Sequence, residues 1–145
     1  MIPWVQEQGI IPNEDIEMLS RIRRILKNLP DLDLSNDSSG QKILLSCHIL
    51  ARALANHFRL EYRDGHYCRR YEHAWLVTPQ SHIIDFYPIA TVGGPIMIAH
   101  DFVNSTRLYQ PCHARQLTPK FSDPSFRRAV KILIRTIQTI DSPPA

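Results

Sequence analysis

The sequence predicts an α+β domain in which three helices pack on a small antiparallel sheet. Apolar residues recur at helical spacing over about residues 14–28, 47–58 and 124–140, and strand-like runs lie between the second and third of these segments. A chain of 145 residues fits one domain, residues 1–145, and can bury enough surface to fold without disulfides or metals. We therefore expect a single domain.

The first helix is expected from about Glu14 to Asn28. Asn13 suits the N-cap position, and acidic residues at the start with basic residues later fit the helix dipole. The apolar face comprises Ile16, Leu19, Ile22, Ile25, Leu26 and Leu29. Pro30 should end this helix, and the acidic, turn-rich stretch 31–40 should form a surface loop.

The second helix is expected from Cys47 to Phe58, with Cys47 on its apolar face. If Ser46 caps a helix that starts at Cys47, the sulfur lies where unpaired N–H groups and the helix dipole stabilise a thiolate. If the helix instead begins near Gln41, most of that contribution is lost. The sequence leaves both starts open.

Two strand-like runs, residues 74–78 and 81–86, flank Pro79-Gln80 and predict a hairpin. An odd-numbered loop places His73 opposite Asp85 on one face, whereas a two-residue loop places them on opposite faces. A triad of Cys47, His73 and Asp85 therefore requires the odd-numbered loop, and we expect that loop.

The register that places His73 opposite Asp85 pairs Val77 with Ser81. It also puts Trp75 and Ile83 on the same face, and Trp75 is then expected, with Phe58, to wall a site.

Cys47, His73 and Asp85 are the candidate catalytic residues. A thiol needs a neighbouring imidazole to ionise near neutral pH, and the imidazole needs an acceptor on its far nitrogen to fix tautomer and orientation. A backbone N–H near Cys47 would stabilise the oxyanion. Each residue alone also has a structural interpretation: a cysteine on an apolar helix face is usually a small core residue, and His73 and Asp85 could simply satisfy local hydrogen bonds.

A last helix is expected from Pro124 to about Ile140, because Asp123-Pro124 is a start signal and Pro143-Pro144 stops the chain. The segment 89–120 is expected to add a strand and a lid-like loop.

Composition narrows the function classes. A formal charge of +3 makes nucleic acid an unlikely partner, and the three cysteines argue against a disulfide framework. No apolar run reaches the length of a membrane span and the start lacks signal-peptide features, so we expect a cytoplasmic protein with no membrane partner. No cofactor is indicated.

A metal site is a rival use of the other thiols. It would draw on His66, Cys68, Cys112 and His113, but their spacing is not that of metal ligands, so no metal is predicted. The basic residues Arg63, Arg69 and Arg70 are typical of a solvated loop, although they precede His73 and could select an acidic substrate.

The residues 41–88 resemble the core of the transglutaminase-like, papain-related superfamily. The resemblance rests on a cysteine at a helix start, His73-Ala74-Trp75 opening a strand, and Ile83-Ile84-Asp85 followed by an aromatic residue and proline. It implies a papain-like core and a Cys-His-Asp triad. Arylamine N-acetyltransferases share the order, and Gly93-Gly94 after Asp85-Phe86-Tyr87-Pro88 is loosely similar to their sequences.

The resemblance also implies a role for Gln41, which lies six residues before Cys47, as does the oxyanion glutamine of papain-like proteases. The glycine-rich stretch usual between the two is replaced here by residues 42–45. The hypothesis is therefore a cysteine enzyme acting on an amide or acyl bond of a protein or peptide substrate, or of a small amide. Peptidase, amidase, glutamine deamidase or transglutaminase-type activity and acyl or acetyl transfer all stay open, as does a non-catalytic binding module on the same scaffold.

Overall fold

The computed structural model describes residues 12–86, 95–98, 109–111 and 119–143. Within these ranges the protein is an α+β domain, with three α-helices packed on a five-stranded antiparallel sheet of order β4-β3-β2-β1-β5. The helices are α2 (Asn13–Lys27), α3 (Cys47–Phe58) and α6 (Pro124–Asp141), with a short 3-10 helix η2 (Pro119–Ser122) before α6. The strands are β1 (Glu61–Tyr67), β2 (Tyr71–Val77), β3 (Ile83–Asp85), β4 (Ile96–Ile98) and β5 (Tyr109–Pro111).

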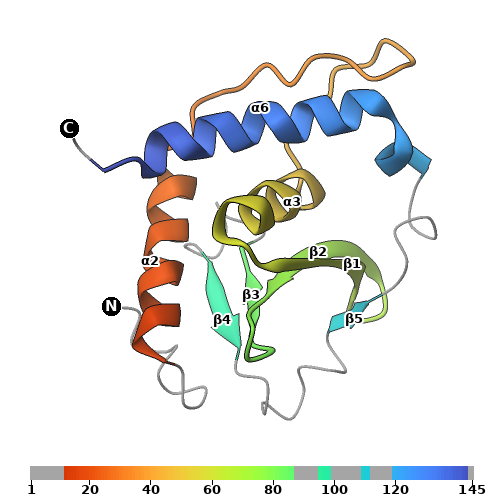
Figure 1. Cartoon of the computed structure of the whole chain (residues 1–145). Coiled ribbons are helices and arrows are strands. Elements are labelled where there is room, and N and C mark those ends of the chain that lie inside the picture. The colour runs from red at the N-terminus through yellow and green to blue at the C-terminus, as the bar shows by residue number, and fades with distance from the viewer. Residues whose placement is uncertain (1–11, 87–94, 99–108, 112–118, 144–145) are drawn as a thin grey trace.

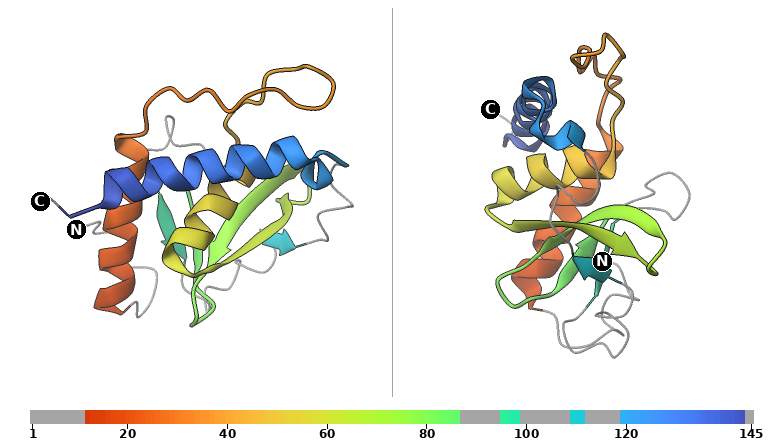
Figure 2. Two further views of the ribbon diagram at one scale, coloured as in Figure 1. Left: turned by 45° about the horizontal axis from the view of Figure 1, so that its top comes forward. Right: turned by 90° about the vertical axis from the view of Figure 1, so that its right-hand side faces the viewer.

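Helix α3 lies between the sheet and α6, while α2 stands beside the β4 end of the sheet (Figures 1 and 2). The main core joins the inner faces of the three helices to alternate residues of the central strands, among them Ala74, Leu76, Ile84 and Met97. A helix buried on both sides is apolar on most of its surface, and α3 follows this rule, with eight of its twelve residues buried. Among the described residues, none of the helices is long and apolar enough to cross a membrane.

The helix bounds agree closely with the sequence prediction. Helix α3 begins at Cys47, one of the two starts that the sequence left open, and Asp123 caps α6 by accepting the N–H of Ser125. The N-cap prediction for the first helix was wrong, because α2 already includes Asn13 and Pro12 occupies the cap position without a side-chain hydrogen bond.

The β2–β3 hairpin has the expected odd-numbered loop but a different register. Val77 pairs with Ile83, not with Ser81, because the Thr78 N–H donates to the His82 carbonyl and Ser81 adopts a left-handed conformation (φ 68°). The partner of Val77 is thus shifted by two residues, from Ser81 to Ile83. A shift by two residues leaves each side chain on the same face of the sheet. Extending this register places Asp85 opposite Trp75 rather than opposite His73.

His73 and Asp85 nevertheless share a face as diagonal neighbours, within reach of each other's side chains. On that face a second apolar cluster forms around Trp75, Ile98 and Tyr109, with Ile83 packed against it. The expectation that Trp75 and Ile83 share the face is confirmed.

Strand β1 was not predicted. It pairs along its whole length with β2, and β5 pairs with its other edge, so the residues around Arg63 form a strand rather than a solvated loop. Strand β4 confirms a strand in the segment 89–120, whereas the expected lid-like loop lies outside the described residues.

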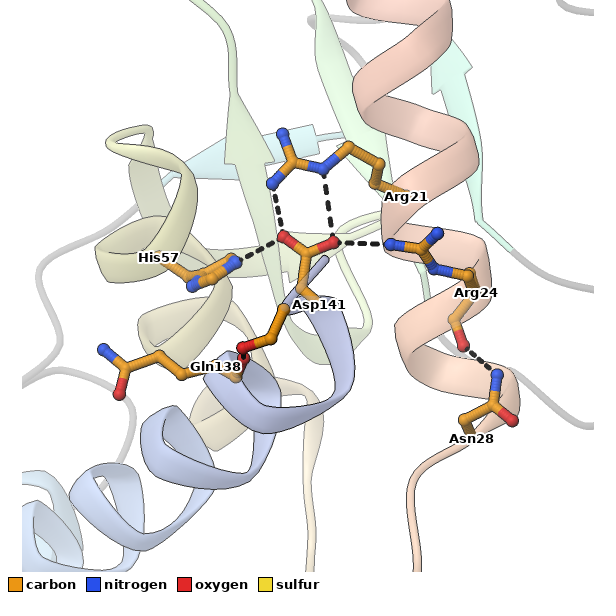
Figure 3. Close-up of polar contacts among 7 residues, drawn as sticks. Arg21, Arg24, Asn28, His57, Gln138 and Asp141 are labelled. Carbon is orange, nitrogen blue, oxygen red and sulfur yellow. Dashed lines mark hydrogen bonds and ion pairs between the residues drawn. The ribbon is translucent and has the colours of Figure 1, made fainter. Parts of the chain in front are cut away.

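Asp141 ties the end of α6 to both other helices (Figure 3). Its buried carboxylate accepts hydrogen bonds from Arg21 and Arg24 on α2 and contacts His57 Nε2 on α3 at 2.7 Å. Burial opposes ionisation of this carboxyl, but these partners outweigh it and lower the pKa of Asp141 to about 2. The network holds the C-terminal end of α3 in place.

Candidate active site

Cys47 is the first residue of α3. Ser46 is the N-cap, and its side chain accepts the N–H of Ile49 at 3.4 Å. The structure therefore selects the first of the two starts that the sequence left open. Cys47 is a free thiol, only 7 % exposed, in the first helical turn, where the dipole favours negative charge.

His73 and Asp85 meet through their side chains. His73 Nε2 lies 2.9 Å from each carboxylate oxygen of Asp85, and both residues are buried. The Tyr109 hydroxyl donates to Asp85 Oδ2 at 2.8 Å. A carboxylate held from a second side in this way has a fixed orientation, and so does the imidazole that it contacts.

The Cys47 thiol is close enough to the same imidazole to contribute to its pKa. Burial disfavours the charged ring, but Asp85 and Cys47 together outweigh it and raise the pKa of His73 to about 9. His73 is therefore positively charged at neutral pH. An imidazolium beside a thiol stabilises the thiolate, and it can also donate a proton to a leaving group.

The two ring nitrogens divide these contacts. Because Nε2 faces Asp85, the nitrogen on the other side of the ring, Nδ1, is the one that exchanges a proton with the thiol. The three candidate residues thus form one connected unit in the order carboxylate, imidazole, thiol.

Backbone donors are present beside the thiol. Ser46 accepts the N–H groups of Ile49 and Leu50, while within the described ranges no hydrogen bond takes up the N–H of Cys47 or of His48. The first N–H groups of a helix have no intrahelical acceptor and suit a developing oxyanion.

Trp75 is only 2 % exposed, and its ring lies 6.2 Å from that of His73. Gln41 lies exposed in the loop before α3, where its N–H donates to Asp37 Oδ1, so its oxyanion role stays a prediction. The expectation that Phe58 walls the site was wrong: Phe58 is the last residue of α3, about 16 Å along the helix from Cys47, and packs against Arg21.

Tyr109 is a residue of the candidate site that the sequence analysis did not identify. It comes from the short strand β5, and only the pairing of β5 with β1 brings it to the site. Burial, and then the Asp85 charge, raise the pKa of Tyr109, so its hydroxyl stays protonated and donates.

The other candidate residues give no second site within the described ranges. Arg63 pairs with Glu61 at 2.6 Å, and Arg69 and Arg70 are exposed in the β1–β2 turn. Of the residues considered for a metal, Cys112 and His113 lie outside the described ranges, and within those ranges no three potential ligands gather.

An open groove of about 1030 Å³ adjoins the N-terminal end of α3. Its walls are the loop of residues 37–45 and the segment 121–126, and its floor includes Ser46, His48 and Glu72. Ser46 and His48 are the chain neighbours of Cys47, and Glu72 is the neighbour of His73. Cys47 and His73 themselves do not line the groove, and Glu72 points to the opposite face of β2 from His73, so the groove lies at the start of α3 on the helix side of the sheet.

No protein-family model, no curated protein and no solved structure matches the chain.

Proposed function

We propose that the protein is a cysteine enzyme of the transglutaminase-like, papain-related type, acting on an amide or acyl bond through Cys47, His73 and Asp85. The observation that carries the proposal is the position of the imidazole: His73 contacts a buried carboxylate 2.9 Å away, and the thiol at a helix N-terminus is close enough to raise the pKa of the same ring. Thiol-based acyl transfer requires this connection.

In the proposed reaction the Cys47 thiolate attacks the carbonyl carbon and forms a C–S bond. The oxyanion takes hydrogen bonds from the backbone N–H groups of Cys47 and His48. The imidazolium of His73 gives its proton to the leaving nitrogen as the C–N bond breaks, which leaves a thioester and an amine.

The thioester is then released by a second nucleophile. Neutral His73 takes a proton from water, or from an acceptor amine, as that molecule attacks the thioester carbon, and the C–S bond breaks to regenerate the thiolate. Asp85 holds the ring throughout and stabilises its charged form, and Tyr109 holds Asp85. Water would make the protein a peptidase, amidase or deamidase, and an amine would make it a transferase.

The proposal is tested by the reactivity of the thiol. Because a free thiol is only about 3 % ionised at pH 7, loss of the imidazole should slow alkylation of Cys47 by up to about 30-fold. Iodoacetamide labelling followed by peptide mapping distinguishes Cys47 from the exposed Cys68. His73→Gln is the test variant, and His66→Gln, outside the site, is the matched control.

Equal alkylation rates in folded wild type and His73→Gln protein would overturn the enzyme proposal and favour a binding module on the same scaffold. If the alkylation rate depends on His73, the next measurement is hydrolysis of a glutamine-containing peptide library. It tests whether water is the acceptor of the acyl group. Cys47→Ala should abolish turnover, and adding Asp85→Asn to it should cost nothing more, because both changes disable one unit.

A further inference from the structure

The groove beside Cys47 carries a net negative charge. Three carboxylates line it, from Asp37, Glu72 and Asp123, against one ammonium group, from Lys42. A hydrogen bond from the Ser39 side chain is the main cause that lowers the pKa of Asp37, and a hydrogen bond from Ser38 does the same for Asp123. Both carboxyls are therefore ionised at neutral pH. A groove of this charge favours a positively charged ligand.

The same groove has an exposed apolar wall. Leu44 is 75 % exposed and Leu45 45 % exposed, directly before the cap of α3. Large apolar side chains at this exposure next to acidic groups are typical of a binding surface rather than of a solvated loop. The ligand should therefore combine positive charge with an apolar portion, as a peptide segment does.

His48 gives the groove a buried polar group. Its side chain is 9 % exposed, and Nδ1 lies 2.8 Å from Asp64 Oδ1. Arg52 binds both oxygens of Asp64, and although burial opposes ionisation, His48 and Arg52 lower the pKa of Asp64. The carboxylate therefore accepts a hydrogen bond from Nδ1–H, and in the tautomer whose one proton is on Nδ1 the ring offers Nε2 as an acceptor.

The Nε2 atom of His48 has no hydrogen-bond partner within the described part of the chain, and its nearest charged neighbour is Glu72 Oε2 at 4.0 Å. Two acceptors that share one ammonium group each lie about 2.8 Å from its nitrogen and are therefore about 4 to 4.6 Å apart, since its N–H bonds diverge at a near-tetrahedral angle. The observed separation fits this arrangement.

We propose that the groove is a docking surface for a peptide segment that carries a lysine, and that this segment belongs to the substrate of the enzyme proposed above. The lysine ammonium lies between His48 Nε2 and Glu72 Oε2, and a neighbouring apolar residue packs on Leu44 and Leu45. This inference rests on the proposed function, because it makes the bound peptide a substrate. The binding itself does not need a reactive thiol.

The lysine is a specificity element and not the acyl acceptor. An ammonium group held by the Glu72 carboxylate keeps its proton, and without a lone pair it cannot attack a thioester. The residue that reacts is another one of the same substrate chain, which the contact in the groove holds near the start of α3.

The test is peptide binding to the full chain carrying Cys47→Ala, which cannot turn over. Two fluorescein-labelled peptides share the same glutamine and leucine residues, one with two lysines and the other with two glutamates in their place. We expect fluorescence anisotropy to show tighter binding of the lysine peptide, and this preference should weaken as salt is added.

Single charge changes then locate the contact. Glu72→Gln should weaken binding of the lysine peptide by up to about fivefold, as for a partly exposed ion pair, and Lys42→Gln should strengthen it. Glu17→Gln on α2 removes the same charge outside the groove and should change nothing.

The inference is overturned if the two peptides bind equally or not at all, or if Glu72→Gln and Glu17→Gln have the same effect. These failures differ from failure of the proposed function. Charge-selective binding with a thiol that does not depend on His73 would retain the groove and reject the enzyme, and a His73-dependent thiol without charge selection would do the reverse.

Discussion

Replacing Asp85 with asparagine tests the electrostatic core of the site. The change keeps the shape of the side chain but removes the charge that His73 Nε2 contacts at 2.9 Å. The difference between the ordinary pKa of 6.5 and the value of about 9 for His73 corresponds to roughly 3 kcal/mol in favour of the imidazolium. Because burial is the largest single influence and opposes the charge, losing Asp85 should bring the pKa back toward 6.5.

The consequence is large at mildly alkaline pH. At pH 8 about 90 % of the rings are protonated when the pKa is 9, but only about 3 % when it is 6.5. Titration of ¹³C-labelled histidine by NMR, with the His73 signal assigned from His73→Gln protein, should show the midpoint fall. The pH profile of Cys47 alkylation should move with it.

The same shift makes a prediction for stability. Since the pKa of His73 is higher in the folded than in the unfolded chain, its proton stabilises the fold fully below about pH 6.5, and this contribution is lost as the pH rises through about 9. The difference in free energy of unfolding between wild type and Asp85→Asn should therefore be largest near pH 6 and shrink by up to roughly 3 kcal/mol toward pH 10. A folded Asp85→Asn protein whose His73 still titrates near 9 would refute the reasoning.

Three further changes test the surroundings of the site. Tyr109→Phe removes a donor to the buried Asp85 and should cost about 1.5 to 3 kcal/mol in unfolding free energy, measured by urea denaturation, with a smaller loss of Cys47 reactivity. Gly65→Ala would push a Cβ into the Gln110 carbonyl of β5, so it should destabilise by about 1 to 3 kcal/mol and expose the Tyr109 ring to fluorescence quenchers. Asp141→Asn should cost about 1 to 3 kcal/mol, since its arginine partners are half exposed and become hydrated again. That loss should be undiminished at neutral pH and disappear only as the pH falls through about 2, where wild-type Asp141 also becomes neutral, and thermal melts at pH 7 and pH 2 measure it.

Local signals made most of the helices predictable. Ser46 as a good cap and Cys47 at the start of the apolar face made Cys47 one of the two possible starts of α3, and the structure decided between them. The shared face of His73 and Asp85 was expected because the triad hypothesis requires an odd-numbered hairpin loop. The pairing register was not predicted correctly, because it depends on which residues of the turn close it, and Thr78 and His82 do so here.

Strand β1 could not be predicted, for a physical reason. Asp64 interrupts its pattern as a polar residue, yet it is buried, because His48 and Arg52 on α3 supply the partners that a buried carboxylate needs. Those partners are known only once α3 packs on the sheet. Tyr109 could not be predicted for the same reason, because its contact with Asp85 exists only after β5 has paired with β1.

Buried carboxylates fix α3 at both ends. Asp64 holds His48 and Arg52 near the start of the helix, and Asp141 holds His57 one residue before its end. The helix spans about 18 Å, so an error in tilt at either end would move the sulfur relative to His73.

The two anchors are not equivalent for the thiol. His48 follows Cys47 directly, so a displacement at Asp64 reaches the sulfur undiminished, whereas one at Asp141 acts from the far end of a helix that Ser46 and the sheet still hold. At equal loss of stability, a substitution of Asp64 should therefore reduce the reactivity of the Cys47 thiol more than a substitution of Asp141. A catalytic thiol needs this placement before the substrate arrives, because orientation fixed by folding costs nothing at the moment of attack.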